Sequence, residues 1–309
     1  FKQKTAYEIR NCDWSSDVCS SDLRRPARIC RISRVSRGPE SFRWVLACAL
    51  SVGLAWSWQT DLAAAAGDEA GRLFDSASDE LGLVESARSR AEESGRRLLL
   101  VAGANWCHDS RALAVRLTTP PLDGFIAKHY EVLFLDVGYL DHGMLALRRF
   151  GTPIYYATPT VLVIEPSSGV VINEGNRHQW RNASLIGLAE ASEYFEEMAV
   201  LEHRRDESSL SAQALQRLAE IDAWELEMVA RLELAYLRLG PMLRTLDEAG
   251  LRPPSFDAQW EEVALFRTLV SLKLDALRTQ VWEADDAAMW NTDAKFPVYA
   301  DFSWESGGN

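Results

Sequence analysis

Cys107 is the residue of this sequence best placed to do chemistry. An apolar run, residues 98–102, comes before it, and a pattern typical of a helix follows from Ser110. A thiolate at the start of a helix faces unpaired backbone N–H groups and the positive end of the helix dipole, and both stabilise the charged sulfur. The polar residues of the segment 105–111 fit an exposed helix start better than a core. We therefore interpret Cys107 as a reactive thiol, with a buried structural cysteine as the alternative.

Two neighbours are expected to adjust the reactivity of this thiol. Ser110 lies one helical turn after Cys107, where its hydroxyl could donate a hydrogen bond to the thiolate. His108 directly follows the cysteine, and its imidazole can carry a positive charge near neutral pH. We expect Ser110 to belong to the catalytic site and His108 to modulate it.

A second motif lies further along the chain, where Ala157-Thr158-Pro159-Thr160 leads into another apolar run. Together with Trp106-Cys107 at a strand-to-helix junction, this motif resembles the redox site of exported thioredoxin-like proteins. The resemblance implies an α/β thioredoxin fold, and it implies that Trp106, Thr158 and Pro159 bind the substrate. It also implies a cis peptide bond between Thr158 and Pro159, with the Thr158 backbone facing Cys107 and pairing with an extended substrate.

The sequence departs from the pattern of that family at two positions. Ser110 stands where the family's resolving cysteine would be, and Val101 stands where thioredoxins carry a buried aspartate. In the family that acid serves proton transfer when the second thiol attacks, so it has no such task when the second thiol is missing. The two departures therefore agree with each other, and they predict a monothiol site.

A monothiol site predicts thiol–disulfide exchange that is completed by another molecule. Release of a mixed disulfide needs glutathione, a second cysteine on the substrate, or another protein. This suits an isomerase or a glutathione-dependent reaction, with protein or peptide thiols and disulfides as partners and no cofactor beyond glutathione as a co-substrate. The alternative is a redox-inactive thioredoxin-fold module that binds a peptide or protein.

The first 66 residues are expected to stand apart from the working protein. Residues 12–23 resemble a translated sequencing adapter, so residues 1–43, which include an arginine-rich stretch, form a doubtful N-terminal segment. Residues 44–66 combine an apolar stretch with small residues, which predicts a signal peptide or, if it is not cleaved, a membrane anchor. We therefore expect a periplasmic or otherwise exported protein in which Cys107 is the single cysteine left.

Charge and side-chain spacing argue against two other classes of function. The chain has 45 acidic and 33 basic residues and a net charge of −12, so its surface should repel nucleic acid. His108 and Asp109 invite a metal site, but neighbouring side chains on a helix diverge by about 100°. The other metal-ligand candidates are His129, Asp141 and His142, and we expect no metal site. Arg177, His178 and Arg181 are expected to form a solvated turn, or to meet an anionic substrate such as glutathione.

The elements that must position these residues follow from the hydrophobic pattern. Residues 67–200 are predicted to form the thioredoxin-like domain, in which residues 98–102 form a central strand buried on both faces. Further strands are predicted at 130–137, 160–164 and 170–172, the first of them central and the last two joined as a hairpin. Helices are predicted at 110–117, 122–129, 143–150 and 183–201.

Residues 201–309 are predicted to form an all-helical domain, because amphipathic helices there are separated by short linkers. Helices are predicted at 210–223, 224–239 and 258–281, with Ser208 and Ser209 as the first cap and a short piece reaching residue 249. Gly240-Pro241 is expected to end the second of these helices.

Overall fold

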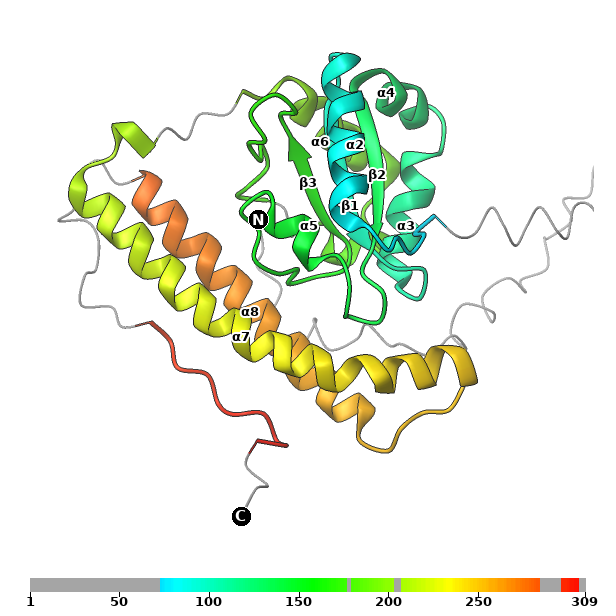
Figure 1. The fold of residues 1–309 in the computed structure, drawn as a ribbon, viewed down its shortest axis with the longest axis vertical. Helices are drawn as coiled ribbons and strands as arrows, with labels where there is room; N and C mark the ends of the chain where they lie inside the picture. The colour runs from blue at the N-terminus through cyan, green and yellow to red at the C-terminus, as the bar shows by residue number, and fades with distance from the viewer. Residues whose placement is uncertain (1–72, 177–178, 203–206, 284–295, 306–309) are drawn as a thin grey trace, which may run out of the picture. The chain divides into compact units, whose positions relative to one another are not determined.

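The computed structural model describes residues 73–176, 179–202, 207–283 and 296–305 (Figure 1). The predicted leader and signal segments, residues 1–66, lie outside the described residues, as do Arg177 and His178. The described elements run in the order α2 (Glu80–Glu93), β1 (Arg97–Gly103), α3 (His108–Leu117), α4 (Leu122–His129), β2 (Tyr130–Asp136), α5 (Met144–Arg148), β3 (Thr160–Ile164), the 3-10 helix η2 (Gln179–Leu185), α6 (Leu188–Val200), the 3-10 helix η3 (Glu207–Ser209), α7 (Ala212–Ala249) and α8 (Phe256–Glu283).

A mixed sheet with β1 in its centre carries the first domain. The strand order is β2-β1-β3, with β1 parallel to β2 and antiparallel to β3. Six of the seven residues of β1 are buried, because five apolar residues in succession place apolar side chains on both faces of the sheet. The predicted position of the 98–102 strand is confirmed, whereas β2 lies at the edge of the described sheet and not in its centre.

Helices cover both faces of this sheet, as Figure 1 shows. Alternate residues of β1 belong to different clusters: Leu98, Leu100 and Ala102 pack with the buried side chains of α2. Leu99 and Val101 pack with buried residues of α3, α4 and α6. An α/β domain with a mixed sheet between helices, followed by a helical C-terminal region, confirms the predicted fold class.

The strand predicted at 170–172 is reduced to a single bridge between Ile164 and Val171. The side chain of Asn173 takes over part of the pairing along β3. The carboxamide of Asn173 accepts a hydrogen bond from the Val163 amide at 2.8 Å and donates one to the Val161 carbonyl at 2.9 Å. Backbone hydrogen bonds remain only at the end of β3, from the Ile172 amide to the Val163 carbonyl and from the Glu165 amide to the Val170 carbonyl. Asn173 bonds to the outer edge before that point, so the second strand does not extend further along β3.

The helix predicted from residue 183 begins later, at Leu188. Gly187 has an extended backbone and is the N-cap of α6. The residues before it form η2, where Trp180 and Ala183 are buried. The Ser184 amide donates to Asp109 Oδ1 at 2.8 Å, so η2 is fastened to α3 and does not continue into α6.

One helix of 38 residues, α7, replaces the three pieces predicted between residues 210 and 249. Its N-cap is Ser211, whose hydroxyl accepts from the Ala214 amide, and not Ser208 or Ser209. An interior proline costs a helix about 3 kcal/mol. Leu239 and Leu243 on either side of Pro241 are both buried, and burying each leucine contributes about 1.5–3 kcal/mol. The helix therefore continues through Pro241, with a bend toward its C-terminal end (Figure 1).

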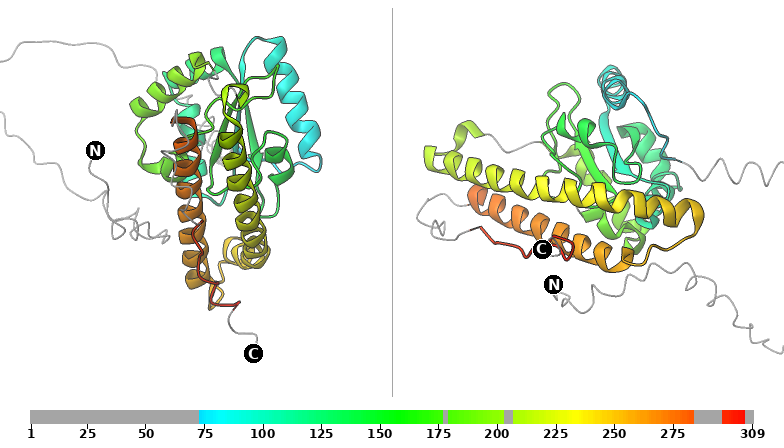
Figure 2. Two further views of the ribbon diagram at one scale, coloured as in Figure 1. Left: turned by 90° about the vertical axis from the view of Figure 1, so that its left-hand side faces the viewer. Right: turned by 60° about the horizontal axis from the view of Figure 1, so that its bottom comes forward.

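The two long helices form a hairpin. Helices α7 and α8 run side by side in both views of Figure 2 and pack on each other. Buried residues of α8 recur at helical spacing, including Val263, Val270 and Leu277. No helix among the described residues is long and apolar enough to cross a membrane.

An ion network holds α7, α8 and the segment before Pro159 together. The guanidinium of Arg278 donates to Glu225 at 2.7 Å and to Asp222 at 2.6 Å. The hydroxyl of Tyr156 donates to the other oxygen of Glu225 at 3.0 Å. Burial acts to lower the pKa of Arg278, but the negative charges of Glu225 and Asp222 outweigh it and raise the pKa. Glu225 is thus a buried charge with two partners.

Replacing Glu225 with alanine is expected to lower the free energy of unfolding by about 3–5 kcal/mol, because Arg278 would lose its buried counter-charge. Urea denaturation of the full chain measures this. Glu220→Ala is the matched control, since Glu220 pairs with Arg217 on the exposed side of the same helix and should contribute about 1 kcal/mol or less. Equal losses for the two variants would contradict a structural role of the buried network.

Candidate functional site

Cys107 lies between the end of β1 and the first residue of α3. It is the N-cap of α3, with an extended backbone, and its side chain is 3% exposed. Its thiol donates a hydrogen bond to the Thr158 carbonyl at 3.2 Å, and the Thr158–Pro159 peptide bond is cis. The structure thus brings together the two motifs that the sequence predicts to be close. The first backbone amides of α3 lack acceptors within the helix, as at any helix start, and the Cys107 side chain makes no cap hydrogen bond to them.

Ser110 is near Cys107 in the chain but makes no hydrogen bond to it. Its hydroxyl is buried and has no hydrogen-bond partner among the described residues. It packs against Gly103, where an added Cβ would lie 2.6 Å from Ser110 Oγ and 2.8 Å from a ring carbon of Phe74. The expected hydrogen bond from Ser110 to the sulfur is therefore not formed, because the thiol bonds to Thr158 instead and the hydroxyl is enclosed beneath Phe74.

Trp106 and His108 flank the cysteine in different surroundings. The indole N–H of Trp106 donates to the Gly138 carbonyl at 2.7 Å, and its ring meets the ring of Trp260 edge-on with centroids 6.1 Å apart. His108 is the first residue of α3 and is exposed to solvent. Trp106 is therefore fixed in the protein interior, whereas His108 is free to meet a molecule from solution.

Residues around Phe74, which no sequence pattern singled out, pack beside the start of α3. The side-chain amide of Asn105 donates to the Phe74 carbonyl at 2.6 Å and accepts from the Phe74 amide at 3.3 Å. The Phe74 ring also meets Phe134 edge-on. Asn105 therefore acts as a side-chain clamp on residues before α2, and only its place two positions before Cys107 could have drawn attention to it.

The contribution of the helical hairpin to the site was also missed. Tyr155 stacks on Tyr236 of α7, and the Tyr236 hydroxyl donates to the Tyr155 carbonyl at 2.7 Å. Burial raises the pKa of Tyr155 well above its ordinary value. The sequence did hold one indication of this contact. Tyr155 and Tyr156 stand directly before the Thr-Pro-Thr motif, and two large aromatic side chains there need another surface to pack against.

The residues weighed for a metal site are dispersed. His129 stacks on Phe125, and His142 hydrogen-bonds to Asp141 at 2.8 Å. Asp109 accepts from the Ser184 amide. Within the described ranges, no three histidine, cysteine, aspartate or glutamate side chains come together as metal ligands would.

Arg181 is not part of a solvated turn, contrary to one of the two expectations for it. Its guanidinium donates to the Ser271 hydroxyl of α8 at 2.9 Å. Burial lowers the pKa of Arg181, the nearby charge of Arg267 lowers it further, and Asp275 acts in the opposite direction. The hairpin therefore reaches η2 as well as the segment before Pro159.

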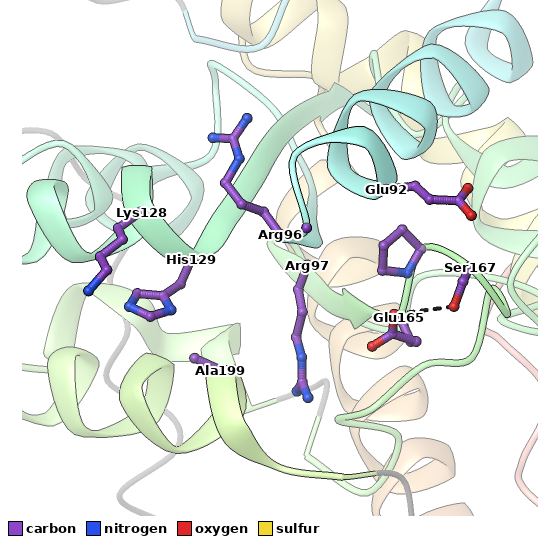
Figure 3. Close-up of a pocket in the computed structure, with 10 residues that line it drawn as sticks. Glu92, Arg96, Arg97, Lys128, His129, Glu165, Ser167 and Ala199 are labelled. Carbon is purple, nitrogen blue, oxygen red and sulfur yellow. Dashed lines mark hydrogen bonds between the residues drawn. The ribbon is translucent and has the colours of Figure 1, made fainter.

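A pocket of about 290 Å³ lies at the opposite end of β1 from Cys107 (Figure 3). Arg96 and Arg97 line it, together with Lys128 and His129. The two arginines already bind the protein itself: Arg96 donates to the Ala127 and Tyr130 carbonyls, and Arg97 donates to the Met198 and Leu201 carbonyls. These cations therefore tie helices to the sheet, and the pocket is separate from the thiol.

Comparison with known proteins agrees with this geometry. Residues 81–166 match the model of a thioredoxin-like family, and the match includes Cys107, Thr158 and Pro159. A solved structure of a disulphide isomerase from Xylella fastidiosa Temecula1 is 30% identical, over 41% of this chain and 96% of that chain, with a TM-score of 0.38. The chain belongs to the thioredoxin-like superfamily. No curated protein matches it.

This thioredoxin-like chain lacks an acid at the buried position before its cysteine. Val101 is fully buried and pairs with Phe134 of β2 and Val161 of β3. The family match ends before η2, so the hairpin of α7 and α8 is an addition that the matched domain does not include.

The unpaired hydroxyl of Ser110 gives a stability prediction. Ser110→Ala is expected to leave the free energy of unfolding unchanged or to raise it by about 1 kcal/mol, because a buried hydroxyl without a partner is unfavourable. Ser271→Ala is the control, since the buried Ser271 hydroxyl accepts from Arg181 and donates to the Thr268 carbonyl, and its loss should cost about 1.5–3 kcal/mol. Thermal and urea unfolding measure both, and a loss at Ser110 as large as at Ser271 would show a hidden partner for Ser110.

Proposed function

We propose that this chain catalyses thiol–disulfide exchange through Cys107 as a single thiol. The fold and the family support thiol–disulfide redox chemistry in general. The observation that carries the finer proposal is the pairing of Cys107 Sγ with the Thr158 carbonyl at the start of α3, with Ser110 in place of a second thiol. Cys107 is a free cysteine, as exchange through a single thiol requires.

The proposed reaction has two balanced steps. Before the first step the Cys107 thiol gives its proton to solvent water or hydroxide, and with it loses the hydrogen bond to the Thr158 carbonyl. The thiolate then attacks one sulfur of a substrate disulfide; a new S–S bond forms to Cys107, and the other substrate sulfur leaves as a thiolate. A second thiol, from the substrate or from glutathione, attacks the mixed disulfide and restores the Cys107 thiolate. When the second thiol belongs to the substrate, the two steps together rearrange the substrate's disulfides without net oxidation.

The neighbouring residues are assigned roles on this proposal. The backbone of Thr158 and Pro159 would pair with an extended substrate segment, and Trp106 would pack beside it. His108, exposed at the first position of α3, would favour the thiolate when its ring is protonated. Such exchange suits an exported, oxidising compartment, which the apolar segment at residues 44–58 predicts.

The burial of Cys107 favours a second candidate function, a redox-inactive module that binds a peptide or protein. In that case the thiol would be a packing group whose hydrogen bond to Thr158 holds the motif together, and disulfides would not react with it.

Isomerisation of a scrambled disulfide protein in a glutathione buffer separates the two candidates. The full chain is expected to speed recovery of the native disulfides above the rate with glutathione alone, and Cys107→Ser should remove that increase. Ser110→Ala should retain it, because the Ser110 hydroxyl does not bond to the sulfur. Equal rates for the full chain and Cys107→Ser would favour the binding module.

Introducing a second thiol tests the geometry of the site. Ser110→Cys is expected to form an intramolecular disulfide with Cys107 in glutathione disulfide, because one helical turn at a helix start allows the required Cα separation of about 4.4–6.8 Å. Both cysteines lie in the tryptic peptide 98–111. Mass spectrometry of that peptide measures the loss of two hydrogens that an internal disulfide causes. Ala112→Cys, in the same helix but on another side of it, is the control. Its new cysteine lies in the tryptic peptide 112–116 and should form no disulfide with Cys107, so the two peptides should stay unlinked. Two persistent thiols in Ser110→Cys would contradict the assignment of this helix start as the site.

A further inference from the structure

We propose that the hairpin of α7 and α8 is a cover over Cys107, and that it must move before a protein disulfide can reach the thiol. The inference concerns the regulation of the site and rests on the proposed function. It follows from where the hairpin makes its contacts.

The surface around Cys107 that a substrate would use is buried. The exposed fractions are 9% for Trp106, 3% for Cys107, 3% for Tyr156, 5% for Ala157 and 6% for Thr158. These residues lie on both sides of the contact between the sulfur and the Thr158 carbonyl. Thiol–disulfide exchange requires access of the incoming disulfide to the sulfur. The conformation described here therefore has little room for a protein substrate.

The hairpin contacts this surface from both of its helices. Trp260 of α8 meets Trp106 edge-on, directly before the cysteine. On the other side, Glu225 of α7 accepts from the Tyr156 hydroxyl, two residues before Thr158. Cys107 belongs to the same buried cluster as the core residues of α7 and α8. The hairpin therefore occupies both flanks of the predicted substrate site.

At the surface, ion pairs that contribute little stability join the hairpin to the first domain. Arg244 of α7 pairs with Asp141 at 3.4 Å, and Arg148 pairs with Glu233 of α7. Both pairs are about half exposed, and exposed ion pairs contribute only about 0–1 kcal/mol each. The packing of α7 on α8 does not depend on these pairs.

Gly240 offers a way to displace the hairpin without touching the site. It lies in the interior of α7, against the backbone carbonyl of Tyr139, and an added Cβ would overlap that oxygen. Alanine otherwise favours a helix over glycine by about 1 kcal/mol, so Gly240→Ala should leave α7 helical while it pushes α7 away from Tyr139. Gly124→Ala is the matched control, because Gly124 lies in α4 and an added Cβ there meets nothing within 4 Å.

The experiment is alkylation of the native full chain by iodoacetamide, followed over time on the tryptic peptide 98–111 by mass spectrometry. The parent is expected to react far more slowly than the same chain in urea. Gly240→Ala should react at least about tenfold faster than the parent, which corresponds to about 1.4 kcal/mol in the opening equilibrium. Gly124→Ala should react at the parent rate.

If circular dichroism shows that Gly240→Ala has lost its fold, a second variant and its control test the same contact. Trp260→Ala removes the contact with Trp106 and should also speed alkylation, whereas Leu265→Ala, at an exposed position of the same helix, should not. A parent that reacts as fast as the unfolded chain would overturn the proposal, as would parent rates in both Gly240→Ala and Trp260→Ala. Faster alkylation without any isomerisation that depends on Cys107 would keep the cover and reject the proposed function.

Discussion

The central strand β1 is the constraint on which the rest of the structure depends. It bonds to β2 on one side and to β3 on the other, and it is buried on both faces. Because neighbours hold β1 on both sides, the chain can leave the sheet only at the C-terminal end of this strand. The chain leaves there through Trp106 and Cys107 into α3, and β3 begins beside the same end, so Thr158 comes within bonding distance of the sulfur. The position of the site is therefore a consequence of strand pairing.

Strand pairing also explains why the sequence predicts the site well. The apolar run at 98–102 has no polar position, which is typical of a strand buried on both faces, and the structure places it in the centre. The helix predicted at 122–129 has the observed bounds, since Pro121 precedes it and strand β2 follows directly. The proximity of Cys107 and Thr158 follows from these elements and from the resemblance to the thioredoxin fold. Local patterns were sufficient here because each element is determined by its own residues.

Prediction failed where side chains distant in sequence decide the outcome. Asn173 takes the place of strand backbone beside β3, and no periodic pattern reveals a carboxamide in that role. Gly240-Pro241 is a common helix end, yet α7 continues because the side chains around it are buried. Cys107 is buried and Trp106 beside it meets Trp260 of α8, and the polar residues around the cysteine gave no sign of either. The Ser110 hydroxyl was likewise placed beside the sulfur by helical spacing, whereas Phe74 and Gly103 enclose it.

The close approach of Gly240 to Tyr139 also supplies a marker that can be read in other sequences. A main-chain carbonyl cannot rotate away as a side chain can, so a side chain at the position of Gly240 is incompatible with this seating of α7. Homologues that share the hairpin and place it in the same way should therefore keep glycine at this position, whatever happens to the residues around it. A homologue with a larger residue there must hold its helices elsewhere. Variation at this single column of an alignment would thus divide the homologues by how the hairpin is placed, before any of their structures is known.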